Sequence, residues 1–359
     1  MPRKEALISQ AVAHLVLDLA CFFLLAGNFS SVAQTSVLAG AGYLIFLILS
    51  YGLRPFFGVI LDEIPRTHSQ AVGCLLVGLA CFLPPSLGWV ALFPAGVGSA
   101  LFHTGAIGES LAFARGYFSR NAVIVSTGVF GAALGTVLAQ KTALSGWIFS
   151  LLLCVLALVC FFFAEARKYP RRIRSFRHSV TLILPDWGIL SLTLIPLLVI
   201  SLVGTLLPAD WAEGPMILIP AAACMLGRGT GGIAADRFGP RKTALVCFAA
   251  ALVLLTVFPH VPWLYCLGLS ALCAPTSICF GTATAALSRR PHLAVGACSA
   301  VILLGTVPAL FHIPLTVSVR CLCGGLLILA LAVSVGLYTD HCRLFHLTAK
   351  IGKRKGDRV

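Results

Sequence analysis

"GRGTGGIAADRFGPRK" occupies residues 227–242 and lies between two long apolar runs. A partial copy of it, "RPFFGVILDEIPRTH", occupies residues 54–68. In each stretch an arginine is followed by a glycine four residues later and by an aspartate after four more: Arg228, Gly232 and Asp236 in one, and Arg54, Gly58 and Asp62 in the other. A charged motif that recurs between apolar runs indicates a duplicated unit, and the apolar runs determine its kind.

The composition indicates a membrane protein. The chain has 359 residues, of which 59% are hydrophobic and 11% are charged, and its mean hydropathy is +0.98. A soluble domain carries about 25% charged residues. About 20 apolar residues in a helix rise about 30 Å, the thickness of the hydrocarbon core of a bilayer. Because such runs recur from end to end, we expect an all-α integral membrane protein.

The apolar runs predict twelve transmembrane helices in two sets of six. The expected spans are residues 6–27, 34–53, 69–86, 88–112, 120–140, 145–164, 183–207, 213–234, 241–258, 261–287, 292–313 and 318–338. They define an N-terminal six-helix bundle (1–164), a basic linker (165–182), a C-terminal six-helix bundle (183–338) and a basic tail (339–359). The first span lacks a small-residue cleavage site, so we expect it to be retained.

The positive charge follows the loops on one side of these spans. Of 26 Lys and Arg residues, only Lys141 and Arg320 fall on the other side. Cytoplasmic loops gather Lys and Arg, so we expect both termini and the linker to be cytoplasmic, in a cell (inner) membrane. The net charge of +14 is then a topology signal with affinity for the lipid bilayer, and no nucleic-acid partner is expected.

An offset of 174 residues superimposes the two motifs, and it also places Pro85 on Pro259 and Arg115 on Arg289. A parallel repeat of six helices is similar to the two halves of the major facilitator superfamily. The motif resembles the signature loop of that superfamily in Gly232, Asp236, Arg237, Gly239, Arg241 and Lys242, and its partial copy keeps Gly58, Asp62 and Arg66. The resemblance implies two pseudo-symmetric bundles that rock about a central cavity, with the motif as a gate. The alternative is a passive solvated turn.

Three further stretches resemble a narrower family. They are "LISQAVAHLVLD" at 7–18, "RPFFGVILDEIPRTHSQAVG" at 54–73 and "GVGSALFH" at 96–103. Together they resemble the fosmidomycin resistance protein family of bacterial exporters, most densely over 7–140 and again over 227–245. The chain departs from that family at Thr104, where proline is usual, at Arg54, where glutamine is frequent, and in the helix at 120–140, which lacks a Gly-Pro motif.

Ionisable residues inside a span are costly and therefore mark candidate functional sites. His14 and Asp18 are one helical turn apart and share a face, and His103 lies at a similar depth in its own span. Our hypothesis is that Asp18 carries a proton and that His14 and His103 tune it or contact substrate. The alternative is a polar tie between the helices at 6–27 and 88–112. Glu109 has two interpretations, a role in proton coupling and a structural role.

The arginines have two interpretations as well. Arg54 and Arg228 could bind an anionic substrate from both halves. Alternatively they extend to the cytoplasmic interface or cap a neighbouring helix, and their distance from Asp62 and Asp236 favours this second interpretation. Arg115 is a further candidate for a tie between helices.

These features predict a secondary active transporter, proton-coupled, that exports small amphipathic or anionic compounds. A proton-coupled importer of a metabolite and a non-transporting membrane sensor or scaffold remain as alternatives. No Walker-type phosphate loop and no nucleophile–base pair occur in the sequence, so no enzyme activity is expected. No metal and no cofactor are expected either, since cysteine and histidine spacing does not suggest zinc and the proton gradient supplies the energy. We expect a monomer.

Overall fold

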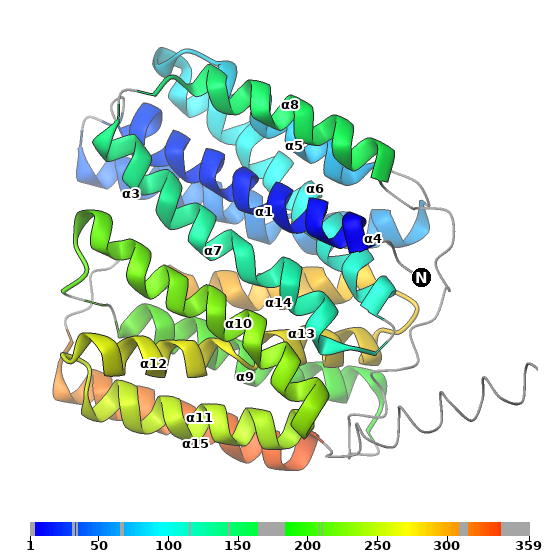
Figure 1. The fold of residues 1–359 in the computed structure, drawn as a ribbon, viewed down its shortest axis with the longest axis vertical. Helices are drawn as coiled ribbons and strands as arrows, with labels where there is room; N and C mark the ends of the chain where they lie inside the picture. Colours follow the sequence, from blue (N-terminus) through cyan, green and yellow to red (C-terminus); the bar gives the residue numbers. More distant parts are fainter. Residues whose placement is uncertain are drawn as a thin grey trace, which may run out of the picture.

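The structure is a computed structural model, and it describes residues 4–30, 33, 35–64, 68–114, 116–142, 144–163, 184–207, 209, 211–308 and 315–338. Over these residues the chain is built of helices (Figure 1). The candidate residues Arg66 and Arg115, the linker at 165–182 and the tail at 339–359 lie outside the described residues.

The helices before the linker form one group in Figure 1 and those after it form another. The first group contains α1 (Lys4–Leu24) with the π-helical turn η1 (Leu25–Phe29), α3 (Ser36–Leu47) with η2 (Ile48–Gly52), α4 (Arg54–Glu63), α5 (Ser69–Phe82), η3 (Pro85–Leu87), α6 (Gly88–Ala114), α7 (Phe118–Lys141) and α8 (Gly146–Phe163). The second contains α9 (Asp186–Leu206), η5 (Gly214–Ile217), α10 (Leu218–Phe238), α11 (Pro240–Val257), α12 (Pro262–Cys273), α13 (Thr276–Ala286), α14 (Pro291–Thr306) and α15 (Val317–Leu337).

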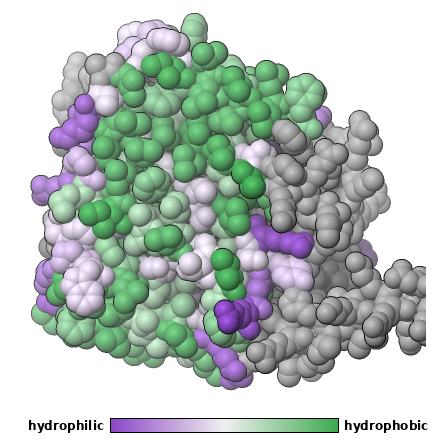
Figure 2. Space-filling model, viewed as in Figure 1, coloured by the Kyte–Doolittle hydropathy of each residue, from purple (hydrophilic) through white to green (hydrophobic). Residues whose placement is uncertain are grey.

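The prediction of an all-helical membrane protein is confirmed. Among the described residues, nine helices are long and apolar enough to cross a membrane. Three further apolar helices, Ser69–Phe82, Gly146–Phe162 and Pro291–Thr306, are shorter than that criterion, so the expected number of twelve spans stays a prediction. Large apolar side chains point outward from the helices, such as Phe162 with 78% of its surface exposed and Val246 with 68%. Figure 2 shows the resulting apolar surface, with hydrophilic side chains gathered at its margins.

The two motifs are largely helical. The stretch at 54–68 follows the expected span 34–53, and its residues 54–63 form α4, which has Pro55 in its first turn. Proline suits that position because the first helical N–H groups lack intrahelical partners. The stretch at 227–242 likewise lies on α10 up to Phe238. Only Gly239 makes a turn, with φ at +97°, a left-handed conformation that favours glycine.

The motif glycines lie where the two groups of helices meet. A Cβ atom added to Gly58 on α4 would overlap the backbone of His292 and Leu293 on α14. One added to Gly232 on α10 would overlap the side chain of Ala122 and the backbone of Phe118 on α7. The absence of a side chain therefore allows each motif helix to pack directly against a helix of the other half.

Other glycines allow close packing within a half, and this predicts a stability difference. A Cβ at Gly131 on α7 would overlap the carbonyl oxygen of Leu15 on α1, whereas one at Gly325 on α15 meets nothing within 4 Å. Gly131→Ala should therefore destabilise the protein by about 1–3 kcal/mol, the usual cost of overpacking. Gly325→Ala should instead be neutral or stabilise it by up to about 1 kcal/mol, because alanine favours helix.

Thermal unfolding of the two purified variants in the same detergent measures this difference. A Gly131→Ala variant as stable as Gly325→Ala would show that α1 and α7 are not packed backbone to backbone at this point.

Candidate functional site

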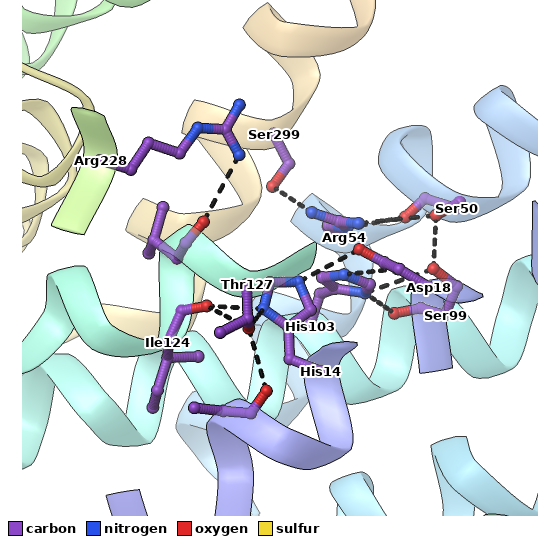
Figure 3. A network of polar contacts seen from close by, with 12 residues as sticks. His14, Asp18, Ser50, Arg54, Ser99, His103, Ile124, Thr127, Arg228 and Ser299 are labelled. Atoms are coloured by element: carbon purple, nitrogen blue, oxygen red, sulfur yellow. Dashed lines mark hydrogen bonds and ion pairs between the residues drawn. The ribbon is translucent and has the colours of Figure 1, made fainter. Parts of the chain in front are cut away.

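The centre of the first group of helices contains a carboxylate between two imidazoles (Figure 3). Asp18 and His14 lie on α1, and His103 lies on α6. The Nε2 atom of His14 is 3.3 Å from Asp18 Oδ2, and the Nε2 atom of His103 is 3.2 Å from Asp18 Oδ1. The two rings are perpendicular, with centroids 4.6 Å apart. We call these three residues the central cluster.

Both imidazoles in the central cluster are oriented by backbone carbonyls. The Nδ1 atom of His14 is 2.6 Å from the carbonyl oxygen of Ile124 on α7, and that of His103 is 2.6 Å from the carbonyl oxygen of Ser99 on α6. A carbonyl only accepts hydrogen bonds, so each Nδ1 carries a hydrogen and donates it. The Nε2 atom of each ring is therefore the one that faces Asp18.

The central cluster is nearly buried but open on one side. His14 and His103 are buried, whereas 17% of the Asp18 side chain is exposed. Gly128 on α7 lies directly beside it, because an added Cβ there would overlap Asp18 Oδ2 and His14 Nε2. Asp18 is thus the partly exposed member of the cluster, and the two histidines are enclosed by their surroundings.

A chain of polar contacts connects the central cluster to the second group of helices. The Ser99 hydroxyl is 3.3 Å from His103 Nδ1 and 2.7 Å from the Ser50 hydroxyl on η2. Arg54 donates from Nε to the Ser50 carbonyl at 2.8 Å and from a terminal nitrogen to the Ser299 hydroxyl at 3.3 Å. Because Ser299 lies on α14, this chain crosses from one half to the other (Figure 3).

The interpretation of Arg54 as an interface residue is wrong. Its exposed fraction is 3%, its guanidinium lies 4.2 Å from the centre of the Tyr51 ring, and it donates to residues of both halves. These polar and aromatic partners compensate the cost of burying the charge, which the count of residues from Asp62 did not reveal. Arg54 thus joins helices of both halves.

Arg228, its counterpart on α10, lines a central cavity of about 540 Å³. One terminal nitrogen donates to the Val125 carbonyl at 3.4 Å, and the buried Nε atom has no hydrogen-bond partner among the described residues. Arg228 therefore does not extend to the interface either. The cavity walls come from both halves and are mostly apolar, with polar atoms from Tyr51, Ser201, Tyr265, Thr276 and Thr306.

The cavity extends toward one end of the molecule only. Its walls include Ala209, Ala212 and Ile217, which precede the start of α10, and Arg228, which lies at mid-helix. Asp236 is close to the other end of α10. The molecule is therefore hollow from its middle toward the 209–217 segment.

The motif aspartates close the opposite end, where each caps the first turn of a helix in the other half. Asp236 accepts from the backbone N–H groups of Phe118 and Ser119 on α7, at 2.8 and 3.0 Å. Asp62 accepts from the N–H groups of His292 and Leu293 on α14, at 3.1 and 2.9 Å. A carboxylate at a helix N-terminus is stabilised by the unpaired N–H groups and the helix dipole.

Asp62 also contacts a side chain of the other half. The Nδ1 atom of His292 lies 2.8 Å from Asp62 Oδ1. An exposed ion pair between Arg290 and Glu63 lies next to it, at 3.3 Å. The remaining motif residues lie around the end of α10, where Arg237 and Lys242 are exposed and Arg241 is half-buried. Arg237 lies 5.3 Å from the centre of the Phe238 ring.

Glu109 on α6 belongs to a separate polar group. Its carboxylate accepts from the side-chain amides of Gln10 on α1, at 3.0 Å, and of Gln70 on α5, at 2.6 Å. Glu109 therefore joins three helices of the first half, which agrees with the structural alternative considered for it.

Several residues of the site had no signal of their own in the sequence. Ser50 and Ser99 lie four residues before Arg54 and His103, so the spacing of one helical turn could have suggested them. Thr127, whose hydroxyl is 3.3 Å from His14 Nδ1, and Ser299 and His292 come from distant parts of the chain. Their contacts depend on how the helices are rotated and packed, which one sequence does not specify.

Comparison with known proteins identifies the architecture. No family model and no curated protein sequence matches the chain. Among solved structures, the chain is similar to a Major Facilitator Superfamily (MFS) transporter, FucP, in the outward conformation, with a TM-score of 0.55 and 14% identity. The similarity covers 91% of this chain and 98% of that one. The chain therefore has the fold of a major facilitator superfamily transporter.

Proposed function

We propose that the protein is a secondary active transporter that exports small amphipathic or anionic compounds in exchange for protons, by alternating access. The fold similarity supports a secondary transporter, with a small-molecule substrate, embedded in a membrane. The observation that carries the coupling to protons is the central cluster, in which an aspartate contacts two histidines inside the membrane-spanning part of the chain.

The geometry of the central cluster supports the binding of protons. Each Nδ1 hydrogen is donated to a backbone carbonyl, so each of the two contacts between Nε2 and Asp18 needs a proton of its own. With both protons present, each contact is a hydrogen bond. When one is lost, a carboxylate oxygen faces a nitrogen lone pair, and that contact becomes repulsive. The proton between His103 and Asp18 would thus hold α6 against α1 at this level, since His14 and Asp18 lie on the same helix.

The polar chain from His103 to Ser299 supports coupling between this event and the movement of the halves. A change at His103 alters the contacts of Ser99, then of Ser50, and then of Arg54, which bonds α14. On the other side, the Ile124 carbonyl that orients His14 lies on α7, which packs against Gly232 of α10. Both histidines are therefore connected to surfaces that must separate when one half rocks against the other.

The cavity supports an amphipathic anion as cargo. Its apolar walls would accept a hydrophobic body, and Arg228, with an unpartnered Nε among the described residues, would attract a negative group. The resemblance of residues 7–140 to the fosmidomycin resistance protein family supports the outward direction. The distribution of Lys and Arg supports an inner-membrane protein with cytoplasmic termini, and the superfamily resemblance supports twelve spans and a monomer.

The first prediction concerns Asp18→Asn, which keeps the shape of the side chain and removes its negative charge. Purified protein in proteoliposomes with an internal pH indicator, tested against a panel of amphipathic anions, should show substrate-dependent proton flux. The proton flux of the variant should be at least about tenfold lower than that of the wild type, because the amide of asparagine cannot carry the proton that the carboxylate of Asp18 would carry.

A matched control is Glu63→Gln, since Glu63 is an exposed carboxylate that pairs with Arg290 at the molecular end. It should keep the flux. Undiminished proton-coupled transport by Asp18→Asn would contradict the coupling role. Protons that move with the substrate instead of against it would identify an importer, and no flux with any compound would favour the sensor or scaffold.

A second prediction concerns the aspartate caps, which alternating access must break. Asp236→Ala removes the acceptor for the Phe118 and Ser119 amides, so hydrogen exchange in the peptide that contains them should become roughly fivefold faster. This factor corresponds to a lost helix cap of about 1 kcal/mol. Mass spectrometry of the detergent-solubilised protein measures the rate.

Asp62→Ala provides the reciprocal control. It should accelerate exchange of the His292 and Leu293 amides and leave the peptide with Phe118 close to the wild-type rate. Equal acceleration of both peptides in either variant would show general loosening of the fold, and unchanged rates would show that the two carboxylates do not cap these helices.

A further inference from the structure

The central cluster has the ligand atoms of a metal site. Nε2 of His14, Nε2 of His103 and a carboxylate oxygen of Asp18 lie within 4.8 Å of one another. A tetrahedral metal ion with bonds of about 2.0–2.1 Å keeps neighbouring ligand atoms about 3.3 Å apart. His14 Nε2 lies 3.3 Å from Asp18 Oδ2 and His103 Nε2 lies 3.2 Å from Asp18 Oδ1, so each nitrogen has about this spacing from one of the two carboxylate oxygens.

The orientation of both rings is a second, independent feature of metal sites. A histidine that binds a metal ion almost always donates its other ring N–H to a carbonyl or carboxylate, which fixes the tautomer and the direction of the lone pair. His14 and His103 both donate from Nδ1 to a backbone carbonyl at 2.6 Å. The lone pair of each neutral ring is thus directed at the space around Asp18.

The backbone of Gly128 lies close beside the ligands. Gly128 has no side chain at the position where a Cβ would overlap Asp18 Oδ2 and His14 Nε2. Because 17% of the Asp18 side chain is exposed, a fourth ligand from solvent can reach the ion. Three protein ligands with one open position is the usual coordination of an exchangeable or reactive zinc site.

A divalent metal ion would give the cluster the same net charge as two bound protons. Two imidazolium rings and one carboxylate have a net charge of +1. One divalent cation with two neutral imidazoles and the same carboxylate also has a net charge of +1. The total charge of the cluster and its surroundings, which include the buried Arg54, is therefore the same in both states.

We propose that His14, Asp18 and His103 bind one divalent transition-metal cation of the Zn²⁺ or Co²⁺ class, in place of two protons. Two imidazole nitrogens and one carboxylate favour these ions over Mg²⁺ and Ca²⁺, which prefer an all-oxygen set. The inference goes beyond the proposed function, because binding requires neither a proton gradient nor a transported compound.

Titration of the full chain with Co²⁺ in detergent tests the proposal, with an affinity tag that contains no histidine. The geometry predicts one equivalent of Co²⁺ per chain with the intense visible absorption of four-coordinate cobalt, and competition by Zn²⁺. His103→Gln should weaken Co²⁺ binding by at least about 100-fold, since even loss of an outer partner of a ligand costs about 10–100-fold.

His260→Gln is the matched control, because His260 is exposed and lies far along the sequence from the cluster. It should bind Co²⁺ as the wild type does. Gly128→Ala keeps all three ligands but places a methyl group against two of them, so it should also lose the band. Thermal unfolding of the metal-free variants tests whether each of them folds. Asp18→Asn takes the place of any variant that does not fold.

Equal Co²⁺ binding by the wild type and His103→Gln, or binding only with the weak absorption of six-coordinate cobalt, would overturn the proposal. Neither result affects proton coupling, which is measured separately by flux in proteoliposomes. Loss of proton flux in Asp18→Asn without any Co²⁺ site would retain the proposed function and reject the metal site.

Discussion

The structure depends on two hydrogen bonds that fix the direction of two imidazole rings. Because His14 and His103 each donate Nδ1–H to a backbone carbonyl, their Nε2 atoms must both face Asp18. A carboxylate next to two lone pairs in an apolar protein interior is unstable without a cation between them. The proposed proton coupling and the proposed metal site both rest on this arrangement, in which α1 and α6 supply the side chains and α7 supplies the carbonyl that orients His14.

The helices around the central cluster are closely packed. Glycines at the crossings of α4 with α14 and of α7 with α10 bring backbones of opposite halves into contact. Such interfaces are either closed or open and do not deform continuously. Two carboxylates, Asp62 and Asp236, hold these crossings at one end by capping helices of the other half. The cavity opens toward the other end, so one closed and one hollow end coexist in the same molecule.

The sequence predicted those features that depend on local spacing. Hydropathy indicated a helical membrane protein, and the repeat of Arg54, Gly58 and Asp62 at Arg228, Gly232 and Asp236 indicated two related halves. Spacing of one turn put His14 and Asp18 on a shared face, which the structure also shows. Arg54 was misplaced at the interface because its compensating partners, Tyr51 and Ser299, become visible only after packing. Cysteine and histidine spacing along the chain predicted no metal, and the site that we propose takes its ligands from two separate helices, α1 and α6.

The duplication is unequal in its chemistry. At the offset that aligns the motifs, the positions of His14, Asp18 and His103 correspond to Gly188, Leu192 and Ser277, none of which is ionisable near neutral pH. The buried carboxylate and its two histidines therefore lie in one half of the chain, while the other half contributes Arg228 and most of the cavity wall. Under the proposed function, substitutions in the second half would alter the surface that receives the cargo and leave the proposed proton-binding residues unchanged.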